Sequence, residues 1–247
     1  MYPMAQRGSA IWWAALAALA APEASAASSI VTVPASLQAG DQYQLIFVTE
    51  EGFDASSPDI STYNLDVTTA AGLNPDLAAF DALNGVTWTA IVSAGPSIDD
   101  KSPDVAAQDN APSLAPVYNL TGAEVSNSLY IGALLAPVNI DQFGGGSGAR
   151  VWTGSDGEGQ VKFPLGTGGE VEVGISNDSS GRDWLDGNFS EAPNPGKTEY
   201  QLYALSSVIT VQTDSPEPAP GPIMLFVLMV AASAKVFRNV TGARSGR

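Results

Sequence analysis

The stretch Tyr43-Gln44-Leu45-Ile46-Phe47-Val48-Thr49 decides the fold, because it predicts a strand at the centre of a sheet. β-Branched and aromatic residues fill it, and these residue types are enriched in strands. The rest of the chain is therefore expected to pack around this strand.

Two helices are predicted directly after this strand. Ser57 is suited to cap the first, with Pro58 at its first helical position, and the apolar residues that follow recur with a helical period. Asn74 and Pro75 repeat the same signal for a second, shorter helix that ends near residues 84–85.

The remainder of the chain is predicted to be strands and turns. Residues 86–92 alternate apolar with small or polar side chains, whereas residues 95–115 are rich in Pro, Asp, Ser and Asn and predict a loop. Further strands are predicted at 116–120, 151–153, 171–175 and 200–211. The expected class is α+β, with two N-terminal helices and a mainly antiparallel, loop-rich sheet.

Several short strings resemble, in the same order, a bacterial extracellular family with a C-type-lectin-like, endostatin-like architecture. They are Phe47-Val48-Thr49, Ala70-Ala71-Gly72-Leu73, Trp88-Thr89-Ala90-Ile91-Val92-Ser93, Val151-Trp152-Thr153-Gly154 and Leu202-Tyr203-Ala204-Leu205. The resemblance covers residues 43–206 and implies a lectin-like fold that binds extracellular polysaccharide. A fold of this kind hosts many functions, so the ligand stays open.

The charge of the body excludes one class of partner. Residues 27–213 carry five cations and twenty-three carboxylates, a net charge of −18. Nucleic-acid binding depends on lysine and arginine, so no nucleic-acid partner is expected. Cysteine and histidine are both absent, which removes disulfides, thiol nucleophiles, histidine bases and the usual zinc ligands. We therefore expect a protein that is not an enzyme and needs no cofactor.

The N-terminus predicts export. Arg7 precedes an apolar stretch at 10–21, and Ala24-Ser25-Ala26 supplies the small residues that signal peptidase requires. Cleavage between Ala26 and Ala27 would make residues 1–26 a signal peptide.

The C-terminus predicts a sorting signal. Pro216-Glu217-Pro218 lies in a proline-rich linker, residues 212–222, and is followed by an apolar run and by scattered cations. Residues 223–247 are thus expected to form a hydrophobic helix with a basic tail that contacts the membrane. This order resembles the PEP-CTERM signal of exported bacterial proteins, which implies an exosortase-type membrane protease as partner.

One loop concentrates groups that could bind a ligand. Asp183, Trp184, Asp186 and Asn188 place oxygen ligands around an aromatic ring shortly before the last strand. One interpretation is a calcium or sugar loop, since calcium takes six to eight oxygen ligands. The other is a solvated connector whose tryptophan fills the core.

Together these features predict an exported envelope or matrix protein with an extracellular body at residues 27–211, which binds polysaccharide without catalysis. Two alternatives stay open. One is a secreted polysaccharide-active enzyme that uses paired carboxylates such as Asp99, Asp100 and Asp104. The other is a purely structural surface protein.

Overall fold

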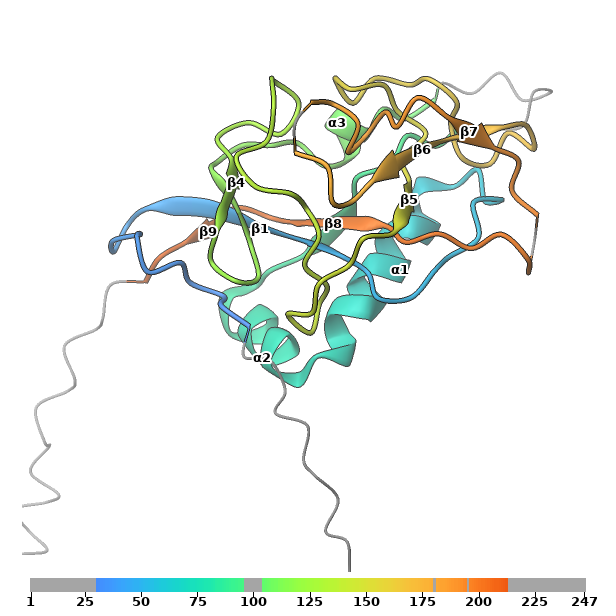
Figure 1. The fold of residues 1–247 in the computed structure, drawn as a ribbon. Coiled ribbons are helices and arrows are strands. Elements are labelled where there is room, and N and C mark those ends of the chain that lie inside the picture. Colours follow the sequence, from blue (N-terminus) through green and yellow to red (C-terminus); the bar gives the residue numbers. More distant parts are fainter. Residues whose placement is uncertain (1–29, 96–103, 180, 195, 213–247) are drawn as a thin grey trace, which may run out of the picture.

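The computed structural model describes residues 30–95, 104–179, 181–194 and 196–212. These residues form an α+β body in which most strand pairs are antiparallel (Figure 1). In chain order the elements are β1 Gln42–Val48, α1 Ile60–Leu73, α2 Pro75–Asn84, β2 Trp88–Ala90, α3 Ala107–Asn110, β3 Val117–Asn119, β4 Glu124–Ser126, β5 Arg150–Trp152, β6 Val171–Ile175, β7 Ser190–Glu191, β8 Tyr203–Ser206 and β9 Ile209–Thr210.

Strand β1 lies at the centre of the larger sheet, which confirms its predicted place. The order is β2-β8-β1-β3-β4, with β9 pairing the start of β1. β8 runs antiparallel to β1, with Ile46 opposite Leu205, whereas β3 runs parallel to it. A second sheet of three strands has the order β5-β6-β7.

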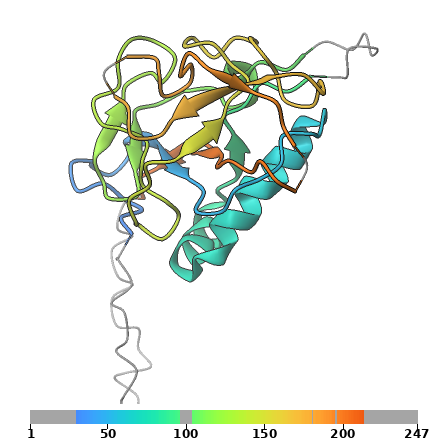
Figure 2. The ribbon, with the colours of Figure 1, turned by 45° about the vertical axis from the view of Figure 1, so that its right-hand side comes forward.

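The two faces of β1 contact two different apolar cores. Tyr43, Leu45 and Phe47 belong to a core that includes residues of α1, α2 and β2. Ile46 and Val48 belong to a second core with residues of β3, β4 and β8. α1 and α2 lie on one side of β1 and β8, and β6 and β7 lie on the other (Figures 1 and 2).

The second helix begins as predicted, and the first does not. The Asn74 side chain accepts hydrogen bonds from the backbone N–H groups of Asp76 and Leu77 at the start of α2. The predicted cap of α1 at Ser57 is wrong, because Asp59 caps it by accepting from the Ser61 N–H at 2.9 Å. A carboxylate is also favoured there by the positive end of the helix.

Two predicted boundaries differ from the structure. The predicted loop at 95–115 contains the short helix α3. The predicted strand at 200–211 is divided into β8 and β9, because Ser206 Oγ accepts the Leu45 N–H at 2.8 Å where a backbone carbonyl would continue the ladder. A side-chain hydrogen bond of this kind competes with strand pairing.

The predicted terminal segments lie outside the described residues. These are the signal peptide with Ala24, Ala26 and Ala27, the sorting motif Pro216, Glu217 and Pro218, and the apolar helix of residues 223–247. Within the ranges that the structure describes, no helix is long and apolar enough to cross a membrane.

Trp88 provides a test of the core around the helices. Its indole is 3% exposed, packs edge-on against Phe47 with ring centroids 4.8 Å apart, and donates from Nε1 to Asp81 Oδ2 at 2.7 Å. We expect Trp88→Ala to lower the free energy of unfolding by about 3–5 kcal/mol in chemical denaturation, because it leaves a cavity and removes the donor to a half-buried carboxylate.

The matched control is Leu83→Ala, since Leu83 is 84% exposed on the neighbouring helix α2. Its cost should stay within about 0.5 kcal/mol. A Trp88→Ala cost equally small would mean that the indole is not part of this core.

Candidate functional site

The candidate site is built on the three-stranded sheet and the segment that follows it. β5 and β6 pair with Arg150 opposite Ile175, and β6 and β7 pair with Glu172 opposite Ser190. Between β6 and β7 the chain folds back onto β6, because the Gly187 N–H donates to the Val173 carbonyl at 3.0 Å. This fold-back brings the predicted loop residues against the sheet.

Trp184 lies in the second core and not on the surface. Its side chain is fully buried and packs edge-on against Tyr203, with ring centroids 5.4 Å apart. The ring is therefore not available to stack on a sugar. This position agrees with the second interpretation of the loop, in which the tryptophan fills the core.

Asp186 binds a cation of the protein itself. Lys162 Nζ lies 2.8 Å from Asp186 Oδ1 and 3.2 Å from Glu172 Oε2. Glu172 is a β6 residue whose side chain is only 1% exposed, whereas the Lys162 side chain is 32% exposed. We call Lys162, Glu172 and Asp186 the carboxylate clasp, since one ammonium group holds two carboxyl groups from different segments.

The clasp shifts the pKa of its members. Burial raises the pKa of Glu172 to about 7, Lys162 opposes this rise, and the adjacent Asp186 adds to it. Burial also works against the charge of Asp186, but hydrogen bonds with Lys162, Glu172 and the Asn188 N–H lower the pKa of Asp186 overall. One carboxyl group of the pair thus holds its proton near neutral pH while the other stays ionised.

Residues of the predicted calcium loop are engaged in hydrogen bonds within the protein. The Asn188 N–H donates to Asp186 Oδ1 at 3.2 Å, whereas the Asp183 carbonyl accepts from the Ile175 N–H. Among the residues that the structure describes, no group of three or more acidic side chains has the spacing to hold a metal ion. The burial of Trp184 agrees with the connector interpretation, and Asp186 already binds Lys162.

A second cluster involves β5 and β7 of the same sheet and joins residues far apart in the sequence. Arg150 Nη1 donates to Glu191 Oε2 at 3.0 Å and to the Tyr200 hydroxyl at 3.0 Å. The Tyr200 hydroxyl also bonds Glu191, and its ring lies on Trp152 with centroids 4.5 Å apart. The Arg150 guanidinium lies 4.7 Å from the centre of the Phe189 ring. We call these five residues the aromatic–arginine cluster.

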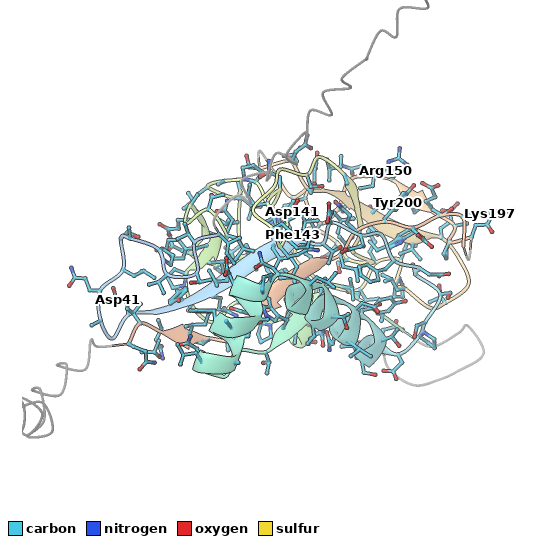
Figure 3. All side chains as sticks on the ribbon, turned by 90° about the horizontal axis from the view of Figure 1, so that it is seen from below. Asp41, Asp141, Phe143, Arg150, Lys197 and Tyr200 are labelled. Carbon is cyan, nitrogen blue, oxygen red and sulfur yellow. The ribbon has the colours of Figure 1, made fainter. Side chains whose placement is uncertain are left out.

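The charged members of the aromatic–arginine cluster are open to solvent, whereas Trp152 is fully buried and Phe189 and Tyr200 are partly buried. The Arg150 and Glu191 side chains are 55% and 37% exposed. Figure 3 shows Arg150 and Tyr200 near each other, toward the end of the molecule where Lys197 lies, whereas Asp41 lies at the opposite end. Planar rings beside an arginine–carboxylate pair offer both a stacking surface and hydrogen-bonding groups.

The sequence prediction missed this cluster. Arg150 precedes a recognised strand, but its separation of 41 positions from Glu191 hides their pairing. The sequence does contain one indication of it. Residues 27–213 have only five cations among twenty-three carboxylates, so each cation has many carboxylates with which to pair.

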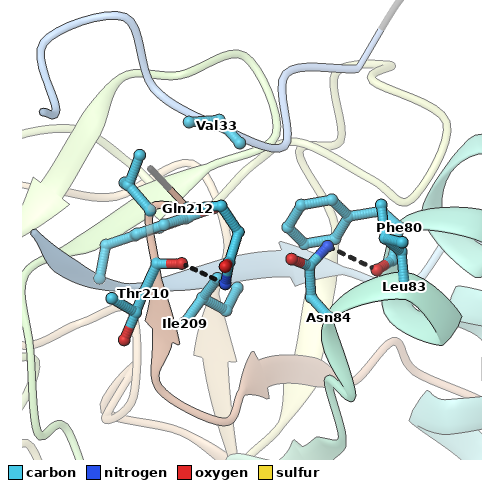
Figure 4. A pocket seen from close by; sticks show the side chains of 9 residues that line it. Val33, Phe80, Leu83, Asn84, Ile209, Thr210 and Gln212 are labelled. Carbon is cyan, nitrogen blue, oxygen red and sulfur yellow. Dashed lines mark hydrogen bonds between the residues drawn. The ribbon is translucent and has the colours of Figure 1, made fainter. Parts of the chain in front are cut away.

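An apolar groove lies elsewhere, between α2 and β9 (Figure 4). Its cavity volume is about 350 Å³, and Val33, Phe80, Leu83 and Ile209 contribute to its lining. The Asn84 amide in the groove donates back to the Phe80 carbonyl at 2.9 Å. That donor is therefore already engaged within its own helix, and the groove presents mainly apolar side chains.

Comparison with protein-family models gives no match, and no curated protein matches the chain in sequence. Function is therefore inferred from the side chains of the site itself.

Gly187 tests the fold-back that builds the site. A Cβ atom there would lie 2.5 Å from the Val173 carbonyl oxygen and 2.9 Å from the Phe189 ring. Gly187→Ala should lower the free energy of unfolding by about 1–3 kcal/mol, because the backbone must shift to make room. Chemical denaturation measures the change.

Gly181→Ala is the control for this substitution, since its Cβ would meet nothing closer than 3.9 Å. Equal effects of the two substitutions would contradict the described packing of the segment on β6.

Proposed function

We propose that the chain is an exported protein of the cell envelope or extracellular matrix, whose lectin-like body binds extracellular polysaccharide without catalysis. In this proposal signal peptidase removes residues 1–26 and an exosortase-type membrane protease acts at the PEP-CTERM-type signal of the C-terminus, after the tail has anchored the chain transiently in the membrane. No cofactor is required.

The aromatic–arginine cluster is the observation that supports polysaccharide binding. Phe189 and Tyr200 flank the Arg150 guanidinium, so ring faces and polar groups lie within a few ångströms of each other. Sugar rings present apolar C–H faces and hydroxyl edges, which fit aromatic faces and charged hydrogen-bonding groups respectively. The exposed positions of Arg150 and Glu191 leave both accessible.

The charges of the cluster favour a neutral polysaccharide. Glu191 already balances the charge of Arg150 at 3.0 Å, and the surrounding body carries a net charge of −18. An acidic polymer would meet repulsion from that field, whereas a neutral one would not. The preferred ligand class is thus a neutral glycan with several hydroxyl groups.

Binding without catalysis agrees with the position of the paired carboxyl groups. Glycoside hydrolysis needs two carboxyl groups on either side of a bound sugar. Glu172 and Asp186 are instead joined through Lys162, and Glu172 is almost fully buried. Of the alternative set, Asp99 and Asp100 lie outside the described residues, and Asp104 lies near Gly95.

Arg150→Ala should weaken binding of the full chain to neutral oligosaccharides by about tenfold or more, equivalent to ~1.4 kcal/mol, because it removes the hydrogen-bonding centre of the cluster. A glycan array identifies the oligosaccharide that binds, and calorimetric titration of that oligosaccharide measures the change. Uronic-acid oligomers of equal length test the charge preference.

The control is Lys197→Ala, which removes another exposed cation that lies beyond the cluster. If both substitutions have the same effect, or if no glycan binds, the polysaccharide proposal fails and a purely structural surface role remains. If the wild-type chain releases reducing sugar from a polysaccharide and Asp186→Ala does not, the protein is an enzyme.

Export makes a separate prediction about covalent structure. The protein isolated from its native host should have an intact mass that corresponds to a chain starting at Ala27 and lacking its C-terminal tail, because both terminal signals are processed. Mass spectrometry of the purified protein measures this directly. A mass that includes residues 1–26 would contradict the export step, and one that includes residues 223–247 would contradict the processing step.

A further inference from the structure

We propose that the carboxylate clasp is a proton-linked switch, which holds the segment Asp186–Glu191 on β6 at acidic pH and loosens it as the pH rises above neutrality. The inference rests on the geometry of Lys162, Glu172 and Asp186 and adds a regulatory property to the body.

The geometry of the clasp favours a proton on one of its two carboxyl groups. The Lys162 ammonium contacts Glu172 Oε2, whereas Glu172 Oε1 is buried and accepts no hydrogen bond from a protein donor. Asp186 is the carboxyl group that shares the Lys162 ammonium with Glu172. Two ionised carboxylates beside one cation repel each other, and a proton on one of them removes that repulsion. Glu172 is the group that fits this proton, since its side chain is almost fully buried and its Oε1 has no donor to stabilise a negative charge.

The charged groups that face Glu172 are few. Lys162 comes from the segment between β5 and β6, and Asp186 comes from the segment after β6. On β7 the opposite residue is Ser190, whose hydroxyl bonds the exposed Glu170. On the β5 side Thr153, an uncharged residue, lies next to Glu172 and donates its backbone N–H to the Glu172 carbonyl. An ionised Glu172 would therefore place two negative charges against one ammonium group.

The segment held by the clasp has several bonds that this repulsion would strain. Asp186 Oδ1 accepts from both Lys162 and the Asn188 N–H. Gly187 and Phe189 exchange backbone hydrogen bonds with Val173 of β6. A displacement of Asp186 would therefore loosen the fold-back and the start of β7.

The sign of the pH effect follows from proton linkage. The pKa of Glu172 is about 7 in the folded protein and 4.5 in an unconstrained side chain, so the native state binds more protons between these values. Stability is therefore highest at the acidic end of this window and falls as the pH rises through about 7. Lys162 stays charged throughout, because hydrogen bonds to Asp186 and Glu172 outweigh burial and raise the pKa of Lys162.

The test compares the full wild-type chain with Glu172→Gln by chemical denaturation from pH 5 to pH 8.5. Glutamine can accept from Lys162 as protonated glutamate does, but it is uncharged at every pH and does not titrate. At pH 5 the two unfolding equilibria should agree. At pH 8.5 Glu172→Gln should be more stable, with an equilibrium constant on the order of ten- to a hundredfold in favour of the folded state.

Glu170→Gln is the matched control, because Glu170 is an exposed glutamate two residues away on the same segment. It should follow the wild-type pH profile. Asp186→Asn gives a second test should Glu172→Gln fail to fold: with the neighbouring charge removed, the fall in stability should move to lower pH. The proposal would be overturned if the difference in unfolding free energy between the wild type and Glu172→Gln did not change with pH. It would also be overturned if Asp186→Asn lost stability over the same pH range as the wild type.

Hydrogen exchange reports on the segment itself. At pH 8 the peptide that covers residues 182–191 should exchange faster in the wild type than in Glu172→Gln, and at pH 5.5 the two rates should agree. If the ratio of the wild-type exchange rate to the Glu172→Gln exchange rate were the same at both pH values, the switch would be contradicted.

Phe189 and Glu191 lie on the same segment, so the switch would also weaken glycan binding above neutral pH. That consequence rests on the proposed function, whereas denaturation and exchange require no ligand. If no glycan binds but the pH-dependent difference in hydrogen exchange is observed, the proposed function is rejected and the switch is retained.

Discussion

The burial of both faces of β1 is the constraint on which the rest of the structure depends. Tyr43, Leu45 and Phe47 need apolar partners on one face, and Ile46 and Val48 need them on the other. Neither face can be left to water without losing about 1.5–3 kcal/mol for each large side chain. The helices, together with Trp152, Val171 and Val173 of the second sheet, cover one face, and residues of β3, β4 and β8 cover the other.

This division explains where the candidate site lies. Strand β5 repeats the alternation of β1, since Val151 belongs to the second core and Trp152 to the first. The neighbouring Arg150 is left at the exposed start of the strand, where Phe189, Glu191 and Tyr200 surround its guanidinium. The polar groups of the site thus lie at the edge of a framework whose interior is apolar, and that framework fixes their positions.

The sequence predicted the parts of the fold that depend on local chemistry. The apolar run at 43–49 and the Asn74–Pro75 helix start need only neighbouring residues to be recognised, and both are confirmed. The division of residues 200–211 depends on Ser206 bonding Leu45, which are 161 residues apart. The burial of Glu172 depends on the segment around Gly187, which follows β6 and folds back onto it. Neither contact leaves a local signal, so the carboxylate clasp and the aromatic–arginine cluster emerge only in three dimensions.

The two clusters connect the framework to its proposed role. The carboxylate clasp holds one end of the segment Asp186–Glu191, and the Arg150–Glu191 ion pair holds the other. Chemical-shift mapping by NMR of the isotopically labelled chain, titrated with a neutral oligosaccharide that it binds, tests this account most directly. We predict that the largest shifts fall on Arg150, Phe189, Glu191 and Tyr200. Shifts concentrated on the α2–β9 groove, with these four residues unmoved, would contradict it.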